Sequence, residues 1–239
     1  DVLVLDGLIA QVGEVSAPPG IVELDGAGRH LAPGVVDCHS HMAIARGVNE
    51  GTVTISCDCD ISDAVDPDDL TIYRALAGGV TTARLLHGSA NAIGGLHEVI
   101  QLKWGRTADE LRFPGAPEGV KFALGENPKR SNGSGRTSRF PGTRLGVAAV
   151  YQRAFPRAEE YVREWNSYDS ALAAGEDPAR PRQDIRLDAL RGMLEGTIPV
   201  HSHCYRADGI LMLMRASEQF GFKIWTLQHV LEGYKVAKE

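Results

Sequence analysis

The chain has 239 residues, of which 43% are apolar and 23% are charged, so its composition is that of a globular protein with one large or two small domains. The net charge of −6 disfavours binding to nucleic acid through a global positive field. No apolar run approaches the roughly 20 residues of a membrane span, and the four cysteines are too few and too irregularly spaced for a disulfide scaffold. No targeting signal is visible at the N-terminus, which begins in mid-pattern, so no compartment is predicted.

The first 32 residues predict short strands joined by turns. Residues 1–6, 8–12 and 21–24 are rich in apolar side chains, and each segment is followed by a Gly or Asp-Gly turn signal. Three short strands cannot bury a core alone. We therefore expect residues 1–32 to form part of a composite β-sandwich.

From residue 33 onward, apolar strands alternate with helical patterns, which is typical of a parallel sheet covered by helices. Six strands without an evident sheet edge favour a barrel. The expected fold class is thus α/β, with an incomplete barrel over residues 33–239. We expect strands at 34–38, 80–86, 99–104, 119–124, 198–203 and 222–229, and helices at 66–76, 186–195 and 208–220.

A long connection, residues 126–197, is expected to form an insertion or lid, because loops of this length are usually functional. It contains an amphipathic stretch at 145–172 that Pro156 should kink or split. Arg144 belongs to a basic run without an acidic residue. Such a run could hold a substrate carboxylate or form a solvated loop.

Five of the eight histidines fall at the carboxyl ends of expected strands: His39, His41, His201, His203 and His229. Residues two apart in a strand point to the same face. Imidazole is a common ligand of zinc and related ions, and active sites of barrels lie at this end of the strands. A single pair could be structural, but two pairs and a fifth histidine indicate a metal site.

The sequence Leu-Ala-Pro-Gly-Val-Val-Asp-Cys-His-Ser-His at 31–41 resembles the first-strand motif of the metal-dependent amidohydrolase superfamily, particularly its imidazolonepropionase-like and prolidase-like branch. Residues 77–82, 200–203 and 222–229 resemble the second, fifth and sixth strands, and residues 5–13 resemble the family's small β-sandwich. The resemblance implies a (β/α)8 TIM barrel that holds one or two divalent ions, usually zinc. It also implies hydrolysis of carbon–nitrogen bonds, in non-peptide amides or dipeptides, by a metal-activated water.

The resemblance further implies a ligand set, carried over by motif. Lys121, four residues before a glycine, matches a carboxylated lysine that bridges two metals; it could instead be a strand lysine paired with an acid. Glu126 is an alternative ligand, or an unligated loop acid. The implied histidine ligands are His39, His41, His201 and His229.

Three further residues are expected to contact a small-molecule or short-peptide substrate: His203, Asn91 and Arg144. The family's catalytic aspartate ends an eighth strand, and only six strands can be assigned here. The chain is therefore expected to be incomplete at its C-terminus, and no catalytic residue is assigned. A deacetylase or deaminase on the same scaffold, or a non-catalytic metal-binding fragment, remain alternatives, and homo-oligomer formation stays open.

Overall fold

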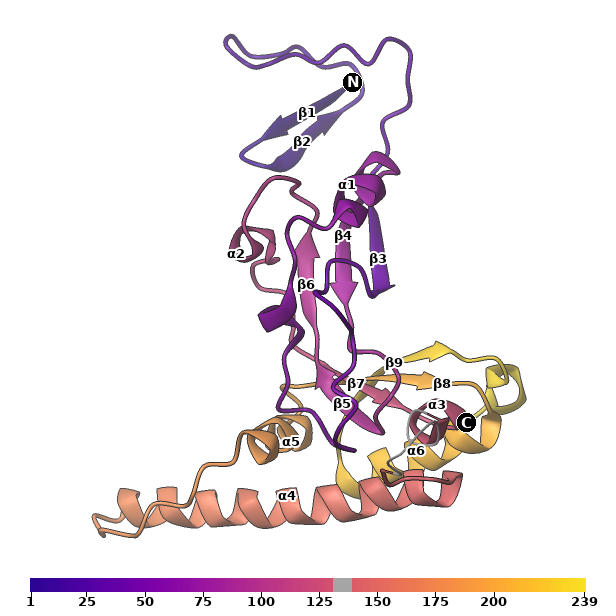
Figure 1. Ribbon diagram of the computed structural model, residues 1–239. Coiled ribbons are helices and arrows are strands. Elements are labelled where there is room, and N and C mark those ends of the chain that lie inside the picture. Colours follow the sequence, from indigo (N-terminus) through magenta and orange to yellow (C-terminus); the bar gives the residue numbers. More distant parts are fainter. Residues whose placement is uncertain (131–138) are drawn as a thin grey trace. The chain divides into compact units, whose positions relative to one another are not determined.

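The computed structural model describes residues 1–130 and 139–239 and divides the chain into two compact units, 1–33 and 34–239 (Figure 1). In the first unit, β1 (Val2–Leu5) and β2 (Leu8–Val12) form an antiparallel hairpin. The strand expected at 21–24 is not present. Val22 and Leu24 are 83% and 91% exposed, so these residues have no neighbouring strand or apolar surface that would stabilise an extended conformation.

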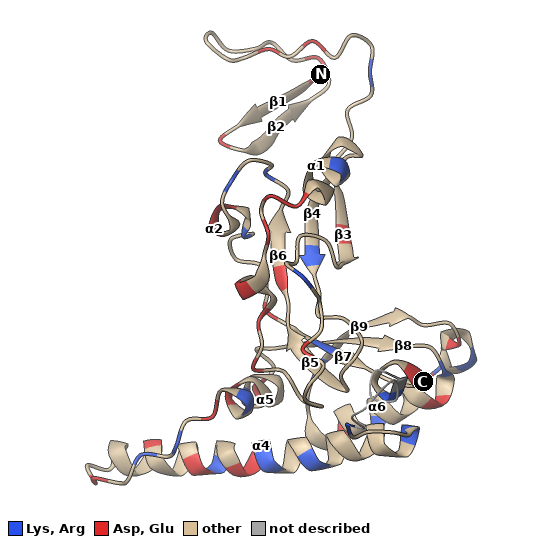
Figure 2. Ribbon diagram, viewed as in Figure 1, with Lys and Arg blue, Asp and Glu red and all other residues tan. Residues whose placement is uncertain are grey.

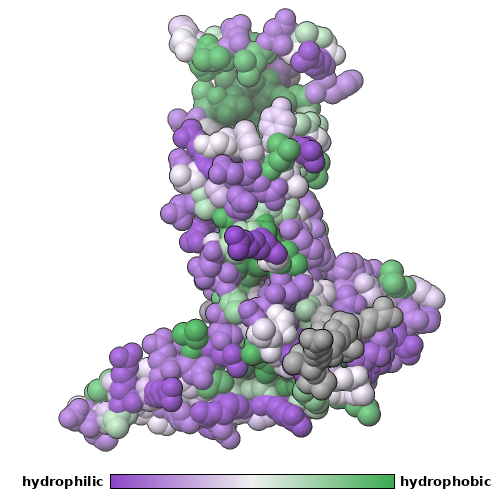
Figure 3. Space-filling model, in the orientation of Figure 1, coloured by the Kyte–Doolittle hydropathy of each residue, from purple (hydrophilic) through white to green (hydrophobic). Residues whose placement is uncertain are grey.

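Apolar side chains of the hairpin are also exposed, as the green surface of this unit in Figure 3 illustrates. The side chains of Leu8, Ile9 and Val12 are 73%, 69% and 70% exposed. A two-stranded hairpin buries too little apolar area to be stable alone. The composite β-sandwich expected from the sequence therefore remains a prediction.

In the second unit, a three-stranded sheet has the order β3 (Val35–Ser40), β4 (Val80–Leu85) and β6 (Glu98–Gln101). β3 and β4 are parallel, and α1 (Leu70–Ala77) lies between them in the chain. β6 runs antiparallel to β4, contrary to the expected all-parallel order. The segment between β4 and β6 contains no crossover helix of the kind that joins neighbouring parallel strands.

A four-stranded sheet has the order β5 (Ile93–Leu96), β7 (Val120–Ala123), β8 (Val200–Cys204) and β9 (Ile224–His229). β7, β8 and β9 are parallel, whereas β5 is antiparallel to β7 and was missed by the sequence analysis. The fold is thus mixed α/β. The described strands form sheets of two, three and four strands, so the incomplete barrel of about six strands expected from the sequence is not seen as one continuous sheet in the described residues.

The helices start and end at identifiable capping residues. α1 begins after Asp69 and not at Asp66, where the sequence predicted its start. The Asp69 side chain accepts a hydrogen bond from the Thr71 backbone N–H and so caps the helix. α5 (Ile185–Glu195) starts after Asp184 and ends at Gly196, whose φ of 78° suits glycine. The remaining helices are α2 (Ala108–Leu111), α3 (Glu126–Arg130), α4 (Arg144–Ala173) and α6 (Ala207–Phe220), with short 3-10 turns η1 (Ile61–Ala64) and η2 (Gly233–Val236). None of the helices in the described parts of the chain is both long and apolar enough to span a membrane.

α4 is one continuous helix through Pro156, so the expected kink or split is wrong. Proline removes the hydrogen bond to the carbonyl of Gln152, but Gln152 is exposed and water can solvate that group. Buried side chains on both sides of the proline, such as Phe155 before it and Tyr161 after it, hold the helix against the core. The exposed face carries charges of both signs (Figure 2), with Arg157 pairing to two glutamates.

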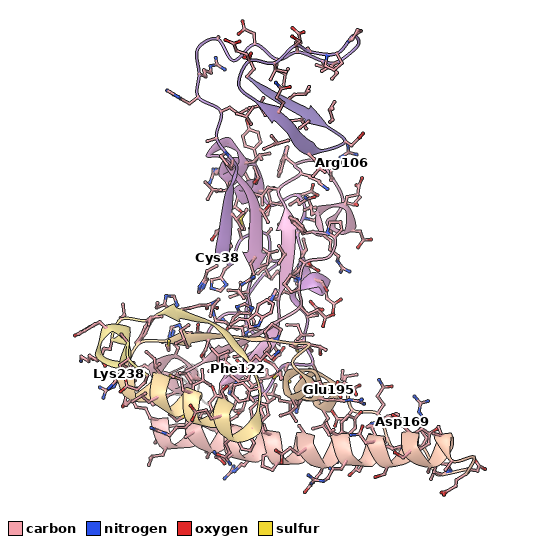
Figure 4. The ribbon with its side chains drawn as sticks, turned by 180° about the vertical axis from the view of Figure 1, so that it is seen from behind. Cys38, Arg106, Phe122, Asp169, Glu195 and Lys238 are labelled. Atoms are coloured by element: carbon pink, nitrogen blue, oxygen red, sulfur yellow. The ribbon has the colours of Figure 1, made fainter. Side chains whose placement is uncertain are left out.

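The main core lies between the four-stranded sheet and helices α4, α5 and α6. Phe122, labelled in Figure 4, extends from β7 into this core, and Phe155 stacks on Phe222 with ring centroids 4.6 Å apart. A smaller cluster of buried residues, including Ile72, Ala83 and Leu85, joins α1 to the three-stranded sheet. The described part of the 126–197 connection thus supplies core helices rather than a lid; residues 131–138 lie outside the described chain.

We expect Pro156→Ala to raise the free energy of unfolding by roughly 1–3 kcal/mol, because alanine restores the helix N–H and has the higher helix propensity. Urea denaturation of the variant and the parent chain measures the change. Ala158→Pro, two residues further along the same helix, is the matched control and should be strongly destabilising. A Pro156→Ala variant no more stable than the parent would contradict the expectation that Pro156 costs α4 stability.

Candidate functional site

The parallel strands β7, β8 and β9 have one apolar and one polar face. The side chains of Phe122 and Val200 pack into the main core. Successive side chains of a strand point to opposite faces, so the residues next to them in the chain point away from the main core. We call the face that these residues form the inner face of the sheet. In the strand register, Lys121, His201 and Thr226 lie side by side across the three strands. Ala123, His203 and Gln228 form the next such row, two residues closer to the carboxyl ends of the strands. We call each row a level.

Four histidines from three strand ends gather at the carboxyl edge of this face. We call His39, His41, His203 and His229 the histidine cluster. The His39 ring centroid lies 5.1 Å from that of His41 and 5.2 Å from that of His229. The His203 and His229 centroids are 4.6 Å apart.

The orientation of His41 is fixed by the backbone. Its Nδ1 lies 2.8 Å from the Leu86 carbonyl oxygen, which can only accept, so Nδ1 carries the proton. The Nε2 of neutral His41 therefore has a free lone pair, and it lies 3.3 Å from the Nε2 of His39. Burial, followed by the charge of Lys121, lowers the pKa of His39 to about 4, and burial also lowers that of His41. Two neutral imidazoles that converge in this way can share a proton or bind one cation.

His229 joins the cluster because the backbone turns there. It is the last residue of β9, and strand alternation alone would place it opposite Gln228. Its φ is 68°, an unfavourable value for a side chain with a Cβ, and this turn coincides with a ring that contacts those of His39 and His203. The position is typical of a residue held for function.

The structure groups His203, and not His201, with the other strand-end histidines. Cys204 pairs with His229 in the register, so His203 is close to the level of His229, whereas His201 is level with Thr226. The two nitrogens of buried His203 have no hydrogen-bond partner, whereas Nδ1 of His201 lies 2.8 Å from Thr226 Oγ1. The sequence predicts His201 as a metal ligand and His203 as a substrate contact; the structure places His203, rather than His201, beside the other strand-end histidines, and both roles stay predictions.

Lys121 is fully buried and donates a hydrogen bond to the Gln228 side-chain oxygen. The alternative of a lysine paired with an acid is not seen, because no carboxylate of the described residues forms an ion pair with it. Burial lowers its pKa to about 8, so a substantial fraction of the amine is neutral near pH 8. Its charge also lowers the pKa of His39, His203 and His229.

Glu126 and Arg144 line a pocket of about 170 Å³ beside the cluster. Glu126 pairs with Lys129 at 2.8 Å and with Arg144 at 2.9 Å, and these cations hold the pKa of its carboxyl below the usual value. Tyr205 also lines the pocket, and its ring centroid lies 4.3 Å from that of His203. The pocket and the histidine cluster therefore share a wall.

Asn91, expected to contact substrate, has a structural environment. It is fully buried, and its amide nitrogen donates to the carbonyls of Glu50 and Val53 and to Ser56 Oγ. These bonds hold the segment around 50–56 to the loop after β4. The position was expected at the barrel mouth because it follows a strand, but tertiary contacts turn the side chain inward.

The donor atoms of the histidine cluster are of the kind that binds a divalent metal ion. As the side chains stand, no three His, Cys, Asp or Glu of the described residues have the spacing of a metal centre. The donor chemistry nevertheless fits: His41 is oriented by a carbonyl on its second nitrogen, as metal-bound histidines usually are. Buried His203 also has two nitrogens without a partner. A divalent ion would give such nitrogens the partner that they lack.

Three residues near the site were missed in the sequence: Arg84, Gln228 and Tyr205. Arg84 alternates with the buried Ala83 and Leu85, and a charged residue within an apolar strand is a signal that could have been used. Gln228 precedes His229 and occupies an inward position. Tyr205 had no local signal, because only folding brings it beside His203.

The structure thus defines a mixed α/β protein with a histidine-lined site at the carboxyl ends of parallel strands. No family model matches the sequence. The chain is 33% identical to "Amidohydrolase tasK" of Hapsidospora irregularis over 99% of its own length and 26% of that protein. It is 32% identical to an imidazolonepropionase of Mycolicibacterium smegmatis, over 48% of this chain and 33% of that one.

A solved structure is also similar. A crystal structure of an amidohydrolase from Thermotoga maritima MSB8 matches 99% of this chain and 61% of its own, with a TM-score of 0.88 and 34% identity. The chain belongs to the amidohydrolase superfamily. It spans less than two thirds of the length of each relative that it matches.

Proposed function

We propose that this protein is a divalent-metal-dependent hydrolase of carbon–nitrogen bonds in small amides or dipeptides. The observation that carries the proposal is the convergence of the Nε2 atoms of His39 and His41 at 3.3 Å, with His41 oriented by the Leu86 carbonyl. The names of the related proteins agree with hydrolysis of amide-type bonds. Imidazolonepropionase in particular suggests that cyclic amides belong among the substrates tested.

The ligand set proposed here is His39, His41, His203 and His229, with Lys121 beside them. When bound, zinc or a similar ion supplies Lewis acidity, which lowers the pKa of water and polarises an amide carbonyl. Lys121 can contribute in a carboxylated form: its neutral amine attacks carbon dioxide, loses a proton and gains two carbamate oxygens. The lowered pKa of about 8 makes that amine available near neutral pH.

The pocket beside the cluster suggests how substrate is oriented. Arg144 shares the Glu126 carboxylate with Lys129, so these three side chains carry one net positive charge. A substrate carboxylate in the pocket would therefore be attracted to Arg144. Tyr205, on the shared wall, would separate that carboxylate from the bond at the histidine cluster. N-acylated amino acids and dipeptides have this arrangement of groups.

We expect chain purified without chelator to contain close to one or two equivalents of zinc, manganese, iron or nickel by elemental analysis. A metal content below about a tenth of an equivalent, both as purified and after zinc is added and the excess removed, would contradict the proposal.

The metal-loaded protein is then assayed with dipeptides, N-acetylated amino acids and imidazolone-type cyclic amides, and His41→Ala is the variant expected to be inactive. Loss of acetate from N-acetyl sugars, or of ammonia from amino-substituted rings, would instead identify a deacetylase or deaminase. Metal binding without turnover would identify a metal-binding protein.

A further inference from the structure

The pocket beside the histidine cluster has two arginines in its wall. Arg144 is the first residue of α4, and Arg206 comes immediately before α6; both line the pocket. A Cβ on Gly125 would lie 3.3 Å from Arg144 Nη1, so this guanidinium lies against the backbone that follows β7. Two cations from different helices therefore line one cavity of about 170 Å³.

Each of the two arginines is paired with a carboxylate. Arg144 Nη2 lies 2.9 Å from Glu126 Oε1, and Arg206 donates two hydrogen bonds to Asp208, of 3.0 and 3.2 Å. The Arg206–Asp208 pair is exposed, and an exposed ion pair contributes little to stability, so a ligand carboxylate can take the place of Asp208. The hydrogen bond from Arg206 holds the pKa of Asp208 below its usual value, and the charge of Arg144 adds to this effect. The two ion pairs are therefore close enough to act on one ligand.

The charge of the pocket matches one carboxylate and not two. Glu126 offsets one of the two arginines, so the lining side chains have a net charge of +1. Lys129 and Asp208, which pair with these side chains from outside the lining, cancel each other. One carboxylate makes the pocket neutral, whereas a second one would leave excess negative charge beside Glu126.

The rest of the lining limits the size of a ligand. It consists of Leu124, Tyr205 and two glycines, Gly125 and Gly209. A Cβ on Gly209 would lie 3.8 Å from Leu124 Cδ1, which is ordinary contact, and because Leu124 lines the same pocket, a side chain at 209 would extend into it. A cavity of about 150 Å³ holds one benzene molecule. The pocket therefore has room for a carboxylate with a small side chain, but not for a carboxylate and an aromatic ring together.

We propose that this pocket binds the carboxyl-terminal residue of the substrate, that Arg144 and Arg206 together hold its carboxylate, and that Gly209 restricts it to a small, uncharged side chain. The inference rests on the proposed function, since it names the part of the amide substrate that lies away from the bond that is broken. The substrate class is then an N-acylated glycine or alanine, or a dipeptide that ends in one of these residues. Arg206 and Gly209 are thus assigned to substrate selection.

The test is calorimetric titration of the protein as purified with ketone analogues of N-acetylated amino acids. A methylene group replaces the amide nitrogen in these compounds, so they cannot be hydrolysed. We expect the analogues of N-acetylglycine and N-acetylalanine to bind saturably. Those of N-acetylphenylalanine and N-acetylaspartate should bind at least about tenfold more weakly, the first because of its size and the second because of its additional charge.

Two variants test the assigned residues. Gly209→Ala narrows the pocket by one methyl group and has the higher helix propensity, so we expect it to fold. It should weaken binding of the alanine analogue by at least about tenfold and of the glycine analogue by less than about threefold. Arg206→Gln should weaken both by at least about tenfold, because a charge-assisted hydrogen bond is lost. Arg215→Gln, which changes an exposed arginine of the same helix, is the matched control and should bind like the parent.

The inference is overturned if no analogue binds, if the alanine and phenylalanine analogues bind equally, or if either variant leaves all affinities unchanged. If circular dichroism shows that Gly209→Ala is unfolded, the order of affinities in the parent protein decides. Metal content and turnover test the proposed function separately. Metal-dependent hydrolysis without selectivity among the analogues would reject this inference alone, whereas binding in the expected order without turnover would support the selectivity of the pocket and reject the hydrolase.

Discussion

His203→Ala is expected to weaken zinc binding by at least about a hundredfold, whereas His201→Gln should change it by less than about threefold. The reason is the register of β8 and β9, which brings His203 to the level of His229, while His201 is held lower by Thr226 and Arg84. Truncating His203 removes a proposed ligand. Glutamine at 201 keeps a hydrogen-bonding side chain outside the proposed ligand set.

Zinc affinity is measured by competition with a chromophoric chelator, after circular dichroism has shown that each variant is folded. His30→Ala is the matched control, because His30 is exposed and lies in the first unit. If His201→Gln loses as much affinity as His203→Ala, the grouping drawn from the structure is wrong, and the assignment implied by the sequence resemblance is restored.

Lys121→Met is expected to be more stable than the parent at pH 7 by roughly 2 kcal/mol in metal-free, carbon-dioxide-free buffer. Burial lowers the pKa of Lys121 from 10.5 to about 8. Between these values the unfolded chain binds a proton that the folded chain has released, so the parent gains stability as pH rises from 8 to 10.5. Below pH 8 the burial penalty is complete, at roughly 3 kcal/mol. Methionine removes this burial penalty, but it leaves the Gln228 side-chain oxygen without a hydrogen-bond donor. The unpaired oxygen costs about 1 kcal/mol, which reduces the expected gain in stability.

The measurement is urea denaturation of both proteins at pH 7, 9 and 10.5. The stability difference should shrink over this range and change sign by pH 10.5, where the folded lysine is neutral, the unfolded lysine is half protonated and the loss of the Gln228 hydrogen bond outweighs the remaining burial penalty. Lys103→Met, at an exposed position, is the control and should show no such trend. A difference independent of pH would mean that Lys121 is not the titrating group.

Much of the fold could be predicted because the local pattern agrees with the tertiary structure. The apolar strands with polar residues at alternate positions became β3, β4, β7, β8 and β9, within a few residues of the expected ends. The helices at 185–195 and 207–220 have an amphipathic pattern and end at glycines with positive φ, which are local signals.

The errors occurred where distant contacts outweigh the local pattern. Residues 21–24 alternate like a strand but have no partner strand, so alternation alone was insufficient. Pro156 is a helix breaker locally, yet packing of Tyr151 and Phe155 outweighs its cost in α4. The antiparallel direction of β6 depends on how the chain returns after β4, which no local pattern encodes.

For the candidate site, the sequence by itself determined that histidines would stand at the carboxyl ends of strands, and the period-two alternation predicted a shared face for His39 with His41 and for His201 with His203. Only the tertiary structure decided which of them meet. The choice between His201 and His203 depends on the register between β8 and β9, and the environment of Lys121 depends on Gln228, which is 107 residues away in the chain. Strand register and burial are properties of the packed sheet, so they set the positions and the pKa values that the sequence pattern left open.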